Sequence, residues 1–165
     1  MKKTLILIRH SKAENRAGSD NDFNRALTPE GKSDSLKMAN YLKNAGLLPD
    51  FIVTSSATRA YETAMSFAET LGTGKKSILA VRKLYYCSSK TILDQLFGLG
   101  ENINCAMVVA HNPGISDLTR GLSAGSSVFM DNTQAALIEF DIDHWYQIDE
   151  IKPAKFTSFS LKDIR

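Results

Sequence analysis

The sequence predicts an α/β fold with a mostly parallel central sheet and helices on both faces. Short apolar, β-branched runs alternate along the chain with longer segments in which apolar residues recur at helical spacing. This alternation is typical of parallel sheets that are covered on both faces. The 165 residues contain no internal repeat and no Gly-, Pro- or Ser-rich linker, and 43% of them are apolar. We therefore expect one domain over 1–165 with a substantial core.

The elements follow from local signals. Residues 4–8 are short, apolar and β-branched, as in a buried strand. Thr28 is a suitable N-cap and Pro29 a suitable first residue for a helix that ends at Gly46. The same reasoning predicts strands at 51–53, 78–81 and 105–110, and helices between and after them at 57–71, 90–97 and 113–122.

The last part of the chain is expected to contain two more strands. Residues 133–140 and 144–151 are rich in apolar and aromatic side chains, and the polar turn 141–143 joins them. The predicted order is four strand–helix pairs followed by two strands.

The composition and charge of the chain argue against nucleic acids and membranes as partners. The net charge is +2 and no basic run exceeds Lys75-Lys76, so nothing indicates nucleic-acid binding. Cys87 and Cys105 form no CxxC pair, which fits free thiols in a reducing compartment. The apolar run 4–8 is shorter than the ~7–15 residues of a signal peptide core, and no run approaches the ~18 of a membrane helix. We expect a cytoplasmic protein that does not enter a membrane.

Polar residues follow three of the predicted strands at the point where each strand ends. Arg9 and His10 follow the first, Arg59 lies one helical turn beyond the second, and His111 follows the fourth. Ligands of open α/β sheets bind beyond the carboxyl ends of the strands. Two arginines and two histidines are therefore expected to meet at one edge of the sheet.

These residue types suit a dianionic, tetrahedral group. Guanidinium groups match the geometry of phosphate and keep their charge. The helix that begins near Pro113 adds partial positive charge from its N-terminus. No cluster of carboxylates accompanies the histidines, so we expect neither a metal nor another cofactor.

The same segments resemble a known family. Residues 7–13 (LIRHSKA), 54–64 (TSSATRAYETA), 108–114 (VVAHNPG) and 25–31 (RALTPEG) are similar to the conserved blocks of the histidine phosphatase superfamily, also called phosphoglycerate mutase-like. The length and the Arg-His-Ser-Lys-Ala opening most resemble the SixA-like phosphohistidine phosphatases. The resemblance implies a three-layer sandwich and a metal-independent phosphatase.

The resemblance and the charges together give a hypothesis for the mechanism. His10 attacks phosphorus as a neutral imidazole whose other nitrogen donates to a backbone carbonyl. Arg9 and Arg59 hold the equatorial oxygens and depress the pKa of His10. His111, in its protonated form, is expected to add a further donor. Arg25 is a second candidate for binding phosphate or for ordering the loop after the first strand.

Two departures from the family pattern bear on the substrate. Ser11 stands where the family usually has glycine. Many relatives have a glutamate near Lys83 as general acid, but this chain has no carboxylate between Glu69 and Asp94. An alkoxide leaving group needs a strong proton donor, whereas imidazole leaves as a neutral group once its other nitrogen is protonated. The missing acid favours phosphohistidine in a phosphoprotein over an alkyl phosphate.

Two alternatives remain open at this point. The protein could be a general phosphomonoesterase for a small phosphate ester or a phosphopeptide, with an acid supplied by Glu14, Asp20 or Asp22. It could also be a phosphate-binding module without catalysis. The tyrosines at 85–86 are expected to pack or to lie at the rim, where one of them could line the pocket. We expect a monomer.

Overall fold

A computed structural model describes residues 1–15 and 21–164, in which six strands form one sheet in the order β3-β2-β4-β1-β5-β6. β1, β2, β3 and β4 are parallel, whereas β5 and β6 are antiparallel to their neighbours. The predicted α/β class and the mostly parallel sheet are confirmed. The strands are β1 (Lys2–Arg9), β2 (Phe51–Ser55), β3 (Ile78–Val81), β4 (Cys105–Ala110), β5 (Ala135–Asp141) and β6 (Lys155–Phe159).

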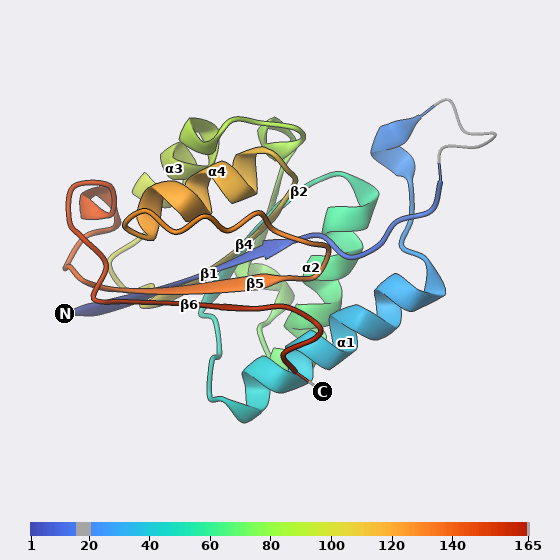
Figure 1. Cartoon of the computed structure of the whole chain (residues 1–165), viewed down its shortest axis with the longest axis horizontal. Helices are drawn as coiled ribbons and strands as arrows, with labels where there is room; N and C mark the ends of the chain where they lie inside the picture. The colour runs from blue at the N-terminus through green and yellow to red at the C-terminus, as the bar shows by residue number, and fades with distance from the viewer. Residues whose placement is uncertain (16–20, 165) are drawn as a thin grey trace.

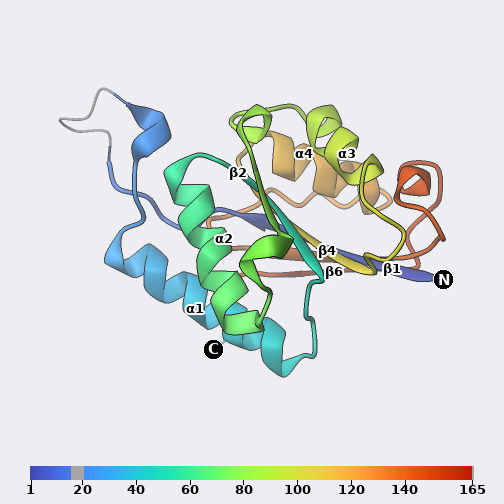
Figure 2. The same ribbon diagram turned by 180° about the vertical axis from the view of Figure 1, so that it is seen from behind.

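Helices cover both faces of this sheet, as expected for three layers (Figure 1). One layer holds α1 (Pro29–Asn44) and α2 (Thr58–Leu71), and the other holds α3 (Ser89–Phe97) and α4 (Gly114–Leu122). The view from behind shows the same two pairs on opposite sides (Figure 2). No helix in the described part of the chain is both long and apolar enough to span a membrane.

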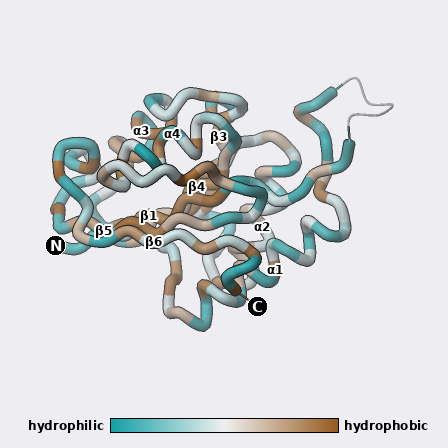
Figure 3. Tube along the Cα trace, in the orientation of Figure 1, coloured by the Kyte–Doolittle hydropathy of each residue, from teal (hydrophilic) through white to brown (hydrophobic). Residues whose placement is uncertain are grey.

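The central strand β1 is apolar on both of its faces. Leu5 and Leu7 pack into the cluster under α3 and α4, whereas Ile6 and Ile8 pack into the cluster under α1 and α2. Figure 3 shows β1 and β4 as the most hydrophobic stretch of the trace. A strand with helices on both sides must be apolar at every position, which explains the continuous rather than alternating pattern.

The first turn of α1 packs directly on the segment that follows β1. Thr28 caps the helix through its hydroxyl, which accepts from the Gly31 amide at 2.9 Å. A Cβ at Gly31 would lie 2.2 Å from the carbonyl oxygen of Lys12, so only glycine permits this approach. The start of α1 thereby fixes the backbone just beyond the end of β1.

The prediction of a strand at 144–151 is wrong. Trp145–Gln147 form a single 3-10 turn, in which the buried Trp145 donates its indole N–H to the Ile103 carbonyl at 2.9 Å. The Gln147 side chain accepts from the amides of Asp143 and His144, which closes the turn. Trp145 and Ile148 are apolar because both are buried in the cluster under α3 and α4, and not because they belong to a strand. The last strand is instead β6, which lies antiparallel to β5.

Candidate active site

The carboxyl ends of β1, β2 and β4 meet at one edge of the sheet, as predicted. His10 follows β1, His111 follows β4, and Arg59 lies in the first turn of α2 after β2. The ring centroids of His10 and His111 are 5.0 Å apart, and the Nε of Arg59 lies 3.4 Å from the Nε2 of His10. His10 and His111 are 101 positions apart in the sequence, yet they lie in one site.

His10 is held as a neutral imidazole with a defined tautomer. Its Nδ1 donates to the Ser11 carbonyl at 2.8 Å, which leaves Nε2 with its lone pair on the side of Arg59. Burial, followed by the charges of Arg59, Arg9 and Arg25, lowers the pKa of His10 to about 3, although the hydrogen bond to Ser11 acts in the opposite direction. The arginines depress this pKa, as predicted from the sequence, but burial lowers it more.

The backbone around His10 is fixed by buried hydroxyl groups. Thr133 donates to the Ser11 hydroxyl at 2.7 Å, and Ser11 lies 2.6 Å from the hydroxyl of Ser35, which donates to the Gly31 carbonyl at 3.0 Å. Because Ser35 uses its hydrogen on that carbonyl, the Ser11 hydroxyl donates to Ser35. The serine that replaces the usual glycine is thus fully bonded and does not disturb the site.

Arg59 is completely buried and its guanidinium is almost fully engaged. Its Nη1 donates to the Asp22 carbonyl at 2.8 Å, and its Nη2 donates to the Asp22 carboxylate at 3.1 Å and to the Tyr86 hydroxyl at 3.0 Å. The same guanidinium lies 5.8 and 5.4 Å from the ring centroids of Tyr85 and Tyr86. These contacts fix the orientation of the guanidinium beside the nucleophilic nitrogen.

His111 is neutral, whereas a protonated form was expected from the sequence. Burial, with the neighbouring His10 and the charge of Arg59, lowers the pKa of His111 to about 3 despite the opposing charge of Asp22, so the ring is neutral near pH 7. Its Nε2 lies 2.8 Å from the Ser55 hydroxyl at the end of β2. Within the described residues, its buried Nδ1 has no hydrogen-bond partner. A neutral ring still donates through one nitrogen, so His111 can contact an anion without carrying charge.

A cavity of about 180 Å³ lies between these residues. Three cationic side chains, Arg9, Lys12 and Arg25, line it. Arg25 also donates to the Asp22 carboxylate at 2.9 Å and to the Glu14 carbonyl at 2.8 Å, so it both lines the cavity and orders the loop. The remaining lining residues are His10, Ala13, Tyr86, His111, Asn112 and Asn132. The cavity is strongly basic and suits a small anion.

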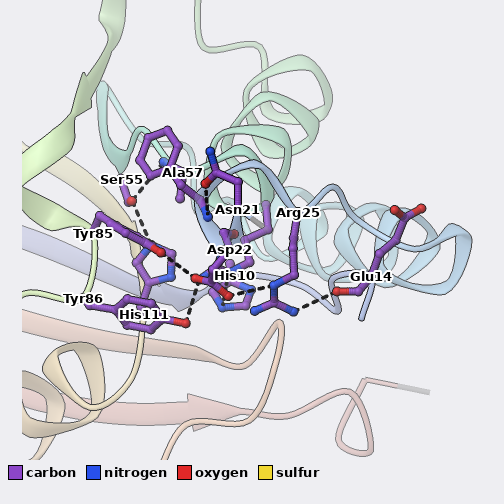
Figure 4. Close-up of polar contacts among 12 residues, drawn as sticks. His10, Glu14, Asn21, Asp22, Arg25, Ser55, Ala57, Tyr85, Tyr86 and His111 are labelled. Carbon is purple, nitrogen blue, oxygen red and sulfur yellow. Dashed lines mark hydrogen bonds and ion pairs between the residues drawn. The ribbon is translucent and has the colours of Figure 1, made fainter. Parts of the chain in front are cut away.

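Asp22 was only one of three carboxylates considered from the sequence, and the structure places it in the site. Figure 4 shows its carboxylate between the hydroxyl groups of Tyr85 and Tyr86 on one side and Arg25 on the other. Burial would raise the pKa of Asp22, but the hydrogen bond from Tyr85 and the charge of Arg59 outweigh it and hold that pKa well below its usual range. Asp22 is therefore ionised.

The other two carboxylates are not placed in the site. The Glu14 side chain points away from His10 (Figure 4), and only its backbone carbonyl contacts Arg25. Asp20 lies outside the described residues. Among residues 1–15 and 21–164, no three His, Cys, Asp or Glu side chains come together in a way that could hold a metal ion.

The low pKa values of the two buried histidines predict how the free energy of unfolding depends on pH. Both have a pKa of about 3 in the folded protein, against about 6.5 in an unfolded chain. Below pH 6.5 the unfolded chain binds protons that the folded protein does not, so the free energy of unfolding falls as the pH falls. We expect a loss of roughly 1 kcal/mol per histidine between pH 7 and 5.5.

Urea unfolding at pH 7.0, 6.0 and 5.5 measures this loss, because most carboxylates titrate below this range. The variants His10→Gln and His111→Gln should each have a shallower dependence on pH than the wild type. A wild-type free energy of unfolding that is constant over this range would contradict the assigned protonation states.

Comparison with known proteins agrees with this geometry. Residues 5–82 match the family model of the histidine phosphatase superfamily (branch 1). The solved structure of a SixA protein histidine phosphatase complexed with tungstate is similar with a TM-score of 0.82 and 21% identity, over 98% of this chain and 99% of that one.

Two further proteins extend the comparison. A SixA structure from Agrobacterium tumefaciens, described as a putative phosphohistidine phosphatase, gives a TM-score of 0.79 and 22% identity over 96% of this chain and 99% of that one. An uncharacterized chloroplastic protein of Arabidopsis thaliana is 28% identical over 87% of this chain and 69% of its own length. Residues 5–82 thus match the histidine phosphatase superfamily, and the fold of the chain is that of the SixA structures.

Proposed function

We propose that this protein is a phosphatase that removes the phosphoryl group from phosphohistidine in a phosphoprotein, through a phosphorylated His10. One observation carries the proposal. His10 is neutral, its Nε2 keeps a lone pair beside the Arg59 guanidinium, and the adjoining cavity is lined by cations. This arrangement supports phosphoryl transfer to His10, since such transfer depends on positioning and on stabilisation of charge.

The transfer has two steps. The Nε2 lone pair of His10 forms a bond to phosphorus, while the bond from phosphorus to the substrate nitrogen breaks and its electron pair returns to the substrate imidazole. Water then attacks the phosphoryl group on His10, the bond to Nε2 breaks, and the lone pair returns to His10, while the water oxygen and both of its protons leave with the product as dihydrogen phosphate. Arg9, Arg59 and Arg25 hold the phosphoryl oxygens, and His111 donates a further hydrogen bond.

Asp22 favours phosphohistidine over an alkyl phosphate as the substrate. It pairs with Arg59, the residue whose Nε contacts the reacting nitrogen, and its bonds to Arg59, Arg25 and Tyr85 keep it ionised. An ionised carboxylate cannot donate a proton to a departing alkoxide. Imidazole needs no such donor when its second nitrogen already carries a proton.

The size and charge of the cavity bear on the kind of substrate that fits it. A basic cavity of about 180 Å³ suits a phosphorylated side chain presented at a protein surface. We propose a monomer that works in the cytoplasm, although the Arabidopsis relative is described as chloroplastic.

A panel of substrates tests the proposal. Purified protein is assayed in EDTA with a phosphohistidine peptide, para-nitrophenyl phosphate and 3-phosphoglycerate, at pH 7. We expect turnover to follow the quality of the leaving group, with phosphohistidine first, the aryl ester second and the alkyl ester last. Equal or faster turnover of 3-phosphoglycerate would assign the protein to the general phosphomonoesterases, with Asp22 as the acid to test. Binding of phosphate with no turnover of any substrate would indicate a binding module.

A further inference from the structure

Tyr86 stands out in the site because its backbone is strained and its side chain is exposed at the same time. Its φ is +48°, in the left-handed region that bulky residues rarely adopt. It lines the cavity and is 54% exposed, whereas His10 and His111 in the same lining are buried. Strain of this kind persists only where the surrounding structure imposes it, and it concentrates at functional sites.

The contacts around Tyr86 explain how the strain is held. The next residue, Cys87, packs its carbonyl oxygen against the start of α4, where a Cβ on Gly114 would lie only 2.3 Å from it. The Tyr86 hydroxyl accepts from Arg59 at 3.0 Å, and its ring lies 4.7 Å from that of Tyr85 and 5.3 Å from that of His111. The ring is therefore fixed at both its backbone and its hydroxyl end.

Tyr86 is the residue through which the segment 82–86 reaches the cavity. Lys83, in the same segment, does not line it. The hydroxyl of Tyr86 is engaged with Arg59 and with the Asp22 carboxylate, so it is not free to serve as a proton donor. What this position offers to a substrate is the aromatic ring.

We propose that Tyr86 is a specificity-determining residue that selects a planar aromatic leaving group by stacking against it. The proposal rests on the proposed function, because the imidazole of phosphohistidine is such a group. The phosphoryl group lies toward the nucleophilic nitrogen of His10, and the leaving group extends away from it toward the mouth of the cavity. A flat ring gains contact with Tyr86 there, whereas an alkyl or amino leaving group does not.

This proposal is tested with two substrates. Both contain a phosphorus–nitrogen bond, but only one of them has an aromatic ring in its leaving group. Phosphoimidazole has an aromatic leaving group and phosphoramidate has ammonia. Tyr86→Leu and Tyr86→Phe both remove the hydroxyl that orients Arg59, so the effect of the ring is the difference between these two variants. We expect kcat/KM for phosphoimidazole to be about three- to tenfold lower in Tyr86→Leu than in Tyr86→Phe, which corresponds to the usual strength of one aromatic contact. The kcat/KM for phosphoramidate should differ less than twofold between the two variants. Tyr86→Phe keeps the ring and should retain the wild-type ratio between the two substrates.

Two more variants complete the design. Tyr146→Leu is a matched control, because Tyr146 is 56% exposed and does not line the cavity. It should leave both substrates unchanged. Tyr86→Asn removes the ring with a residue that tolerates the left-handed backbone, so it gives the same measurement should the leucine variant fail to fold.

The outcomes separate this inference from the proposed function. Equal losses on both substrates, or no loss on either, would overturn the role of Tyr86 while leaving the phosphatase in place. A wild-type protein that hydrolyses neither compound would overturn the proposed function, and the selection by Tyr86 with it.

Discussion

Replacing His10 with alanine is expected to abolish turnover of every substrate, with a loss in kcat on the order of 10⁴- to 10⁶-fold. The reason is that the Nε2 lone pair of His10, which accepts from the Arg59 Nε at 3.4 Å, is the nucleophile that we propose for the cation-lined cavity. Rapid quenching of the wild type at high pH should trap phosphorylated His10, since phosphoramidate bonds of this kind are stable to base and labile to acid.

His144→Ala is the matched control for this experiment. His144 pairs with Glu101 and stacks on Tyr146 away from the cavity, so its loss should leave turnover unchanged. Near-normal turnover by His10→Ala, or a trapped phosphoryl group on another residue, would refute His10 as the nucleophile.

Replacing Arg59 is expected to have the second largest effect. Arg59→Ala should lower kcat/KM by about 10²- to 10³-fold, comparable to the loss of one donor from an anion-stabilising site. Arg59→Lys should recover little of this loss, because an ammonium group cannot occupy the positions of Nε and Nη2 together. The assay is steady-state kinetics on the phosphohistidine peptide, with kcat and KM measured separately.

Folding must be measured beside the kinetics, because Arg59 is buried and pairs with Asp22. In Arg59→Ala the Asp22 carboxylate keeps Arg25 but loses its other cationic partner, so adding Asp22→Asn should recover part of the stability without recovering turnover. Arg120→Lys, a change in α4 outside the cavity lining, is the control. An Arg59→Ala protein that is folded and nearly as active as the wild type would exclude Arg59 from catalysis.

The order of elements could be predicted from the sequence because each strand is bounded by clear signals. The start of α1 at Thr28 and Pro29 and the apolar strand β4 were predicted at or near their observed bounds. The last strand was misplaced because Trp145 is aromatic and buried, features that strands share with turns that cover a core. Only the tertiary contact of its indole with Ile103 distinguishes the two.

The candidate site could be predicted where side chains follow strand ends. His10, Arg59 and His111 were placed at one edge of the sheet by topology alone. Asp22 and Tyr86 could not be assigned, because each lies in a loop whose path depends on contacts with Arg59 and α4. The neutral state of His111 also depends on burial, which the sequence does not give.

The central position of β1 has a consequence for how the protein acquires its activity during synthesis. β1 leaves the ribosome before its partners, which are Cys105–Ala110 on one side and residues up to Asp141 on the other. Contacts this distant in sequence form slowly and late, since a long stretch of chain must be closed before they form. His10, at the end of β1, thus stays outside an assembled site until both partners of β1 have been made, and a nascent chain that ends before β5 lacks the candidate site.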